Sequence, residues 1–108
     1  LGDYMALKGI VIDPGHGGTD PGAVSNGLKE KDFTLRISKY MYDRLKELGV
    51  PVRLTRDSDV TLTPKERVNK VQSFFGDSKD VVVVSNHLNA GGGDGAEVIY
   101  ALRNNSTL

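Results

Sequence analysis

The sequence predicts an α/β domain with a mostly parallel, twisted sheet and helices on both faces. Residues 10–12 and 81–84 are β-branched runs without polar alternation, which is typical of strands covered on both faces. Two segments with helical spacing of apolar residues lie between these runs. Strands that alternate with helices form parallel βαβ units. The expected order is strand, helix, strand, helix, strand, strand.

Composition restricts both the size of the fold and its partners. The 108 residues suit a single small domain, for which we expect residues 8–108, with residues 1–7 as a tail outside it. Fourteen basic and 14 acidic side chains cancel, so charge gives no reason to expect nucleic acid as a partner. No apolar run approaches the about 20 residues of a membrane span. Without cysteine, a metal could be held only by His, Asp, Glu and water.

The first strand, residues 10–13, leads into a long loop, residues 14–29, that is rich in Gly, Asp, Pro, Ser and Asn. A helix is predicted to begin at Glu30, with acidic residues in its first turn, and to end near Gly49. Apolar residues at spacings of three and four are expected to form its buried face: Phe33, Ile37, Tyr40, Met41, Leu45 and Leu48.

The second half of the chain repeats the pattern. A strand over residues 50–55 precedes a second helix, whose start is marked by Thr63, Pro64 and Glu66 in a capping-box arrangement and whose end is marked by Gly76. Its apolar residues are expected to face the sheet: Val68, Val71, Phe74 and Phe75. Strands over residues 80–85 and 96–101 follow, and residues 104–108 are typical of a helix start. We therefore expect a truncated domain that a further segment or a second chain completes.

Both histidines of the chain follow predicted buried strands. His16 comes after residues 10–13 and His87 after residues 81–85, so in a parallel sheet both would lie at the same edge. Glu30, at the start of the helix fed by the His16 loop, faces the same edge. Two His and one Glu with an open fourth position form a catalytic zinc set. The residues alone leave a plainer alternative equally open: two hydrogen-bonding loop histidines and a first-turn acid that favours the helix dipole.

Other polar residues have weaker claims. Asn89 could donate to a substrate carbonyl or brace its loop, and Glu97 could support the site or point outward. Arg56 could bind a substrate carboxylate, although a surface ion pair is the favoured interpretation. Five aspartates are expected to be turn and cap residues: Asp13, Asp20, Asp57, Asp59 and Asp94.

An ordered series of motifs resembles one enzyme family. The series opens with Asp13-Pro14-Gly15-His16-Gly17-Gly18 and continues through residues 20–23, 27–31, 54–57, 85–90 and 95–100. In this order the motifs resemble the zinc-dependent N-acetylmuramoyl-L-alanine amidases, which trim bacterial peptidoglycan. The resemblance covers nearly all of the chain from Ile10 onward and implies that residues 8–108 are the N-terminal part of a single amidase catalytic domain.

The same resemblance implies a ligand set and a reaction. His16, Glu30 and His87 would be the zinc ligands, the substrate would be peptidoglycan, and the bond cleaved would join N-acetylmuramic acid to L-alanine of the stem peptide. It also implies a location outside the cell or in the cell wall.

Departures from the family pattern leave alternatives. Asn86 stands where the family usually has an apolar residue, and the family's further glutamate, thought to be the general base, has no counterpart up to Leu108. We expect that base beyond Leu108, with Glu97 as a candidate within the chain. One alternative function is an inactive fragment that binds metal and peptidoglycan. Another is an anion- or nucleotide-binding α/β module, although the glycine loop lacks both the Lys-Ser/Thr ending of a P-loop and the dinucleotide spacing.

Overall fold

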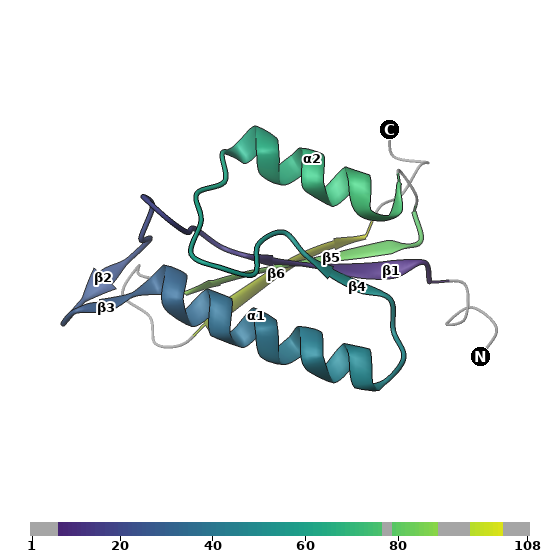
Figure 1. The fold of residues 1–108 in the computed structure, drawn as a ribbon, viewed down its shortest axis with the longest axis horizontal. Helices are drawn as coiled ribbons and strands as arrows, with labels where there is room; N and C mark the ends of the chain where they lie inside the picture. The colour runs from purple at the N-terminus through teal and green to yellow at the C-terminus, as the bar shows by residue number, and fades with distance from the viewer. Residues whose placement is uncertain (1–6, 77–78, 89–95, 103–108) are drawn as a thin grey trace.

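The computed structural model describes residues 7–76 and 79–88 in full and residues 96–102 as backbone. Four strands form one sheet in the order β4-β1-β5-β6, and two helices lie on its opposite faces (Figure 1). The strands are β1 (Gly9–Pro14), β4 (Val52–Leu54), β5 (Val81–Leu88) and β6 (Ala96–Leu102), and the helices are α1 (Glu30–Glu47) and α2 (Pro64–Phe75). The predicted fold class is confirmed.

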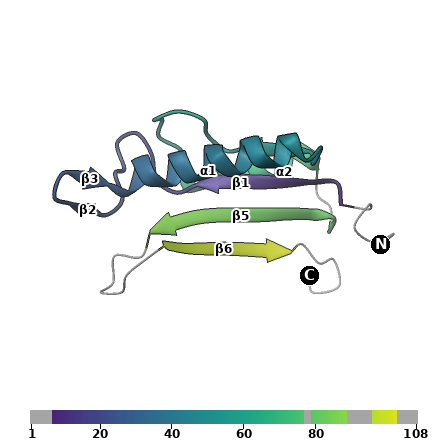
Figure 2. The ribbon, with the colours of Figure 1, turned by 90° about the horizontal axis from the view of Figure 1, so that it is seen from below.

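Strand β1 lies at the centre of the parallel part of the sheet. It pairs in parallel with β4, where Ile12 is opposite Leu54, and with β5, where Asp13 is opposite Ser85. Strand β6 runs antiparallel to β5 (Figure 2). The carboxyl ends of β1 and β5 and the first turn of α1 therefore meet at one edge, which hereafter is the carboxyl edge.

The long loop after β1 contains a small hairpin that was not predicted. Strands β2 (Val24–Ser25) and β3 (Leu28–Lys29) pair antiparallel, and the hairpin extends beyond the carboxyl edge (Figure 1). Its turn is Asn26-Gly27, with φ of +52° and +78°. This dipeptide is the preferred sequence for a two-residue hairpin turn, so the signal was present in the sequence. The hairpin delivers the chain directly to the start of α1.

The predicted buried face of α1 is wrong in part. The helix turns its small polar residues to the sheet, and Thr34 and Ser38 are fully buried. Ile37 and Tyr40 are instead exposed, at 40% and 69%. Small side chains let the helix approach the sheet closely, and here each hydroxyl has a hydrogen-bond partner in the β1–loop segment or in β5. The spacing of apolar residues cannot predict that polar residues such as Thr34 and Ser38 will be buried.

Strand β5 extends further than predicted. It runs through Leu88, so His87 lies within the strand rather than in a loop after it. Val82, Val83 and Val84 are only half-buried, whereas full cover on both faces was expected. Cover by a further segment or chain remains a prediction.

Helix α2 begins as predicted. Thr63 Oγ1 accepts from the Glu66 amide at 3.1 Å, and Glu66 Oε1 accepts from the Thr63 amide at 2.9 Å. Its predicted apolar face is less buried than expected, since Val68 is 54% exposed. Neither helix in the described part of the chain has the length and apolar character needed to cross a membrane.

We expect Thr63→Ala to lower the free energy of unfolding by about 1 kcal/mol, because it removes the hydroxyl that satisfies an otherwise unpaired helical amide. Equilibrium urea denaturation measures this change. Lys65→Ala, at an exposed position of the same helix turn, is the control and should change stability by less than about 0.5 kcal/mol. Equal effects of the two substitutions would contradict the capping role.

Candidate metal centre

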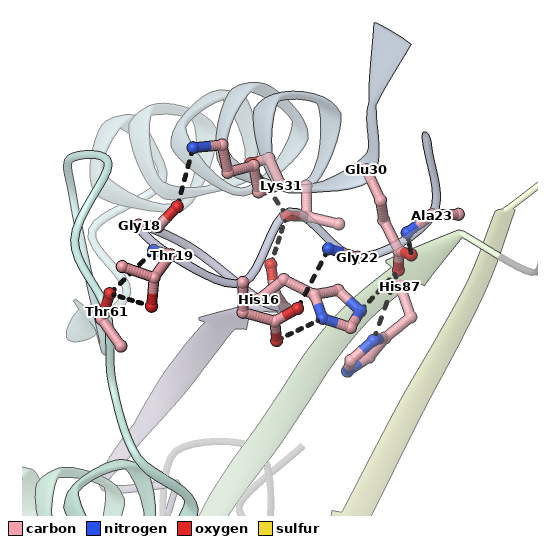
Figure 3. A network of polar contacts seen from close by, with 12 residues as sticks. His16, Gly18, Thr19, Gly22, Ala23, Glu30, Lys31, Thr61 and His87 are labelled. Carbon is pink, nitrogen blue, oxygen red and sulfur yellow. Dashed lines mark hydrogen bonds and ion pairs between the residues drawn. The ribbon is translucent and has the colours of Figure 1, made fainter. Parts of the chain in front are cut away.

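Three side chains from three separate elements converge at the carboxyl edge. His16 comes from the loop after β1, Glu30 is the first residue of α1, and His87 is the next-to-last residue of β5. One ligand-competent atom from each lies within 4.8 Å of the others, and the side chains point toward one another (Figure 3). The imidazole rings meet edge to face at 5.1 Å between centroids. The structure thus brings together the three residues that were predicted as ligands.

Glu30 is the buried centre of this cluster, with an exposure of 5%. Its Oε1 accepts from the Ala23 amide at 3.0 Å, and its Oε2 accepts from the Leu88 amide at 2.9 Å. Oε2 also lies 3.1 Å from His16 Nε2 and 3.5 Å from His87 Nδ1. Burial by itself would raise the pKa of Glu30, but the two amides and the two imidazoles outweigh it, so this pKa lies below its ordinary value. Glu30 is therefore an anion at neutral pH.

His16 is oriented from behind by Asp20. Asp20 Oδ2 lies 2.8 Å from His16 Nδ1, and Asp20 Oδ1 accepts from the Gly22 amide at 3.1 Å. The bond to His16, followed by that from Gly22, lowers the pKa of Asp20. A carboxylate on one ring nitrogen fixes the tautomer and leaves the other nitrogen free to ligate. Asp20 is thus more than the turn residue predicted; its spacing of four from His16 in a glycine-rich loop was the available signal.

Two glycines make room for the three side chains. A Cβ on Gly22 would lie 2.7 Å from His16 Cδ2 and 2.8 Å from Glu30 Oε1. A Cβ on Gly15 would lie 2.6 Å from His87 Cε1. Real Cβ atoms do not approach other atoms this closely, so the cluster requires glycine at both positions.

Asp13 ties together the elements beneath the cluster. Its carboxylate accepts from Thr55 Oγ1 at 2.7 Å, from Arg67 Nη1 at 2.6 Å and from Ser85 Oγ at 2.7 Å. These partners belong to β5, to α2 and to the segment that follows β4. Asp13 was predicted to be a turn residue; it is instead a buried carboxylate of β1, with an exposure of 6%.

At Gly18 and Thr19, the backbone amides of the glycine-rich loop are not free to bind an anion. The Gly18 amide donates to Asp59 Oδ1 at 2.7 Å, and the Thr19 amide donates to Thr61 Oγ1 at 2.9 Å. Asp59 also accepts from Lys31 Nζ, so it is a loop anchor rather than a simple turn residue. These two amides, which a bound phosphate would need, already donate to acceptors within the protein, and one of those acceptors is a carboxylate. The anion-binding alternative is therefore not supported by the geometry.

The remaining candidates fall into two groups. Asn89 and Asp94 lie outside the described residues, and of Glu97 only the backbone is described, opposite His87 in the β5–β6 register. Arg56 contradicts the expected surface ion pair: it is 3% exposed and is hydrogen-bonded to backbone around the cluster. This role was not predicted, although the position of Arg56 just after β4 places it at the carboxyl edge.

A buried carboxylate between two imidazoles, at the carboxyl ends of parallel strands, defines an α/β protein with a site of the type that holds zinc. Comparison with known proteins gives the family. The model of the N-acetylmuramoyl-L-alanine amidase family matches residues 10–108, and the chain belongs to this family. The resemblance inferred from the motifs is confirmed, and the cluster of His16, Glu30 and His87 is consistent with the zinc site typical of the family.

Individual relatives agree with this assignment. N-acetylmuramoyl-L-alanine amidase CwlM of Bacillus licheniformis is 43% identical over 90 residues, which cover 82% of this chain and 34% of that protein. The endolysin of Bacillus phage SPP1 is 44% identical over 92 residues, which cover 83% of this chain and 32% of that protein. The catalytic domain of CwlV from Bacillus (Paenibacillus) polymyxa var. colistinus superposes with a TM-score of 0.69 at 36% identity, over 81% of this chain and 48% of that one. The chain thus spans about a third of these two curated relatives.

We expect Gly22→Ala to weaken zinc binding by tenfold or more, because its methyl group would displace His16 and Glu30. Competition with a chromophoric chelator measures the dissociation constant. Gly27→Ala is a matched control: its φ is also positive, at +78°, but no atom lies within 4 Å of the added Cβ. The control should lose stability through backbone strain and keep its zinc affinity. A similar loss of affinity in both variants would assign the effect to strain in the loop.

Proposed function

We propose that His16, Glu30 and His87 hold a zinc ion and that the protein is a zinc-dependent hydrolase of peptidoglycan. The bond cleaved is the amide between N-acetylmuramic acid and L-alanine. The observation that carries this proposal is the convergence of the three ligand-competent atoms within 4.8 Å, in a chain of the amidase family.

The donor set fits the ion. Two imidazole nitrogens and one carboxylate oxygen form a three-ligand set that leaves a position for water or substrate. The negative charge of Glu30 offsets part of the charge of a dication. Bound zinc supplies a Lewis acid that polarises an amide carbonyl and lowers the pKa of water.

The protein residues supply position and access. The amides of Ala23 and Leu88 hold the Glu30 carboxylate, and Asp20 holds the His16 ring. The side chains of His16 and His87 are 25% and 34% exposed. A substrate amide can therefore approach the two imidazoles from solvent while Glu30 stays buried.

We propose that the general base is supplied by residues that follow Leu108. The described carboxylates of the site are committed elsewhere: Glu30 to the cluster and Asp20 to His16. Glu97 is the candidate within the chain, because its backbone lies opposite His87. Asn89 remains a proposed contact to a substrate carbonyl.

The wider assignments are part of the same proposal. Residues 8–108 are the N-terminal part of an amidase catalytic domain, and residues 1–6 of the predicted tail lie outside the described part of the chain. The protein acts outside the cell or in the cell wall, where peptidoglycan lies.

Glu30 is held in the cluster and Asp20 by His16, so neither carboxylate is available as a general base. This favours one alternative function, a fragment that binds metal and peptidoglycan without hydrolysing it. Hydrolysis distinguishes the two functions. Labelling of free amino groups after incubation with purified peptidoglycan measures new L-alanyl N-termini. Their release by a version extended beyond Leu108, but not by the 108 residues alone, would assign the base to the extension.

We expect a His16→Ala, His87→Ala double variant to lose zinc, because it removes two of the three proposed ligands. Metal analysis after dialysis should find stoichiometric zinc in the wild type and only background zinc in the variant. In a version extended beyond Leu108, chelation should abolish release of L-alanyl N-termini, and added zinc should restore it. Unchanged zinc content in the double variant would refute the proposed ligand set.

A further inference from the structure

Arg56 is a buried cation whose hydrogen bonds to the described residues go to neutral acceptors. It is 3% exposed and follows β4. Its guanidinium donates to four carbonyl oxygens and one hydroxyl, at 2.9–3.2 Å. The acceptors are the carbonyls of Pro14, Gly15, Lys31 and Ser58 and the hydroxyl of Thr34. Burial, followed by the nearby Arg67 cation, lowers the pKa of Arg56. A buried charge is costly, so this arrangement calls for an explanation.

Two of these acceptors are directly adjacent in sequence to proposed ligands. Nη2 of Arg56 donates to the carbonyl of Gly15 at 2.9 Å and to that of Lys31 at 3.0 Å. Gly15 precedes His16, and Lys31 follows Glu30. A single nitrogen thus bridges the backbone of the two ligand-bearing segments and limits the distance between them.

Thr34 forms the same bridge a second time. Its hydroxyl donates to the Gly15 carbonyl at 2.7 Å and lies 3.1 Å from the Lys31 carbonyl, while it accepts from Arg56 Nη2 at 3.2 Å. Thr34 is fully buried. The bridge is therefore a closed, desolvated network and not a flexible surface contact.

The third proposed ligand joins the network through the backbone amide of the same residue, Gly15. The Gly15 amide donates to the Asn86 carbonyl at 3.0 Å, and Asn86 directly precedes His87. All three ligands are therefore linked through Gly15. Gly15 is the neighbour of His16, its amide bonds to the neighbour of His87, and its carbonyl accepts from the same nitrogen of Arg56 as the carbonyl of Lys31, the neighbour of Glu30. Arg56 and Thr34 each reach two of these groups, the carbonyls of Gly15 and Lys31.

The chemistry of the side chain matches this task. Guanidinium presents five N–H donors in a rigid planar fork, whereas the lysine ammonium is a single charged point on a flexible stem. Substitution by lysine keeps the charge and removes the fixed geometry between Gly15 and Lys31.

We infer that Arg56 is a positioning residue of the metal centre, which sets the separation of His16 and Glu30 through the carbonyls of Gly15 and Lys31. This inference rests on the proposed zinc function. It concerns metal affinity and coordination geometry, and Arg56 acts through backbone carbonyls.

The test compares Arg56→Lys with Arg53→Lys in the purified protein. Arg53 is an exposed arginine of β4; its Nη1 donates to the adjacent Val52 carbonyl, and its guanidinium lies over the Phe75 ring. Chelator competition measures zinc affinity, the d–d absorption of Co²⁺ reports coordination geometry, and thermal unfolding of the metal-free protein reports stability. We expect Arg56→Lys to weaken zinc binding by 10- to 100-fold and to shift the Co²⁺ spectrum. Arg53→Lys should leave the affinity and the spectrum unchanged.

The outcomes separate the two proposals. If the wild type binds no zinc, the proposed function fails and this inference fails with it. If the wild type binds zinc and Arg56→Lys binds it within twofold of wild type, with an unchanged Co²⁺ spectrum, Arg56 is a structural brace and the inference alone is wrong. Should Arg56→Lys not fold, Thr34→Val removes the parallel bridge and is expected to weaken zinc binding in the same direction. Unchanged affinity in that variant would overturn the inference.

Discussion

Burial of the Glu30 carboxylate is the constraint on which the rest of the site depends. An ionised carboxylate that is 5% exposed costs several kcal/mol unless partners replace its water. Here the partners are two backbone amides and two imidazoles, which come from the loop between β1 and β2 and from the end of β5. The chain can bury Glu30 only if all of these segments meet at one edge, and the parallel pairing of β1 with β5 brings them there.

Hydrogen bonds fix much of the backbone arrangement at the carboxyl edge, because the fully apolar core is small. Among the described residues the buried hydrophobic side chains are Val11, Ile12, Val52 and Val81. At the carboxyl ends of the strands the buried groups are instead Asp13, Thr55 and Arg56. Buried polar groups are tolerated when they are fully hydrogen-bonded, and such networks specify a single arrangement of the backbone. Hydrophobic side chains thus pack the middle of the sheet, whereas hydrogen bonds fix the backbone arrangement at the edge where the proposed ligands lie.

This division explains what the sequence could and could not predict. Periodicity and capping residues are local signals, and they predicted the strand and helix order and the helix start at Thr63. The two histidines and Glu30 were predictable as a cluster because parallel strands and the following helix share an edge. The buried face of α1 was not, because Thr34 and Ser38 are buried for their hydrogen bonds and not for their hydrophobicity. The acceptors of Arg56 lie up to 42 residues away in sequence, and no local pattern encodes such a contact.

Each proposed ligand is held by a different constraint. Glu30 is fixed by two amides, His16 by a left-handed backbone with φ of +62° and by Asp20, and His87 by the pairing of β5. Three independent constraints fix three orientations, but they do not by themselves fix the distances between the side chains. Distances require a group that bonds to more than one ligand-bearing segment. Gly15 meets this requirement, since its amide bonds to the segment of His87 and its carbonyl shares donors with the segment of Glu30. A glycine is needed there because any Cβ would collide with the His87 ring, so the residue that joins the segments is also the one that leaves room for the ligands.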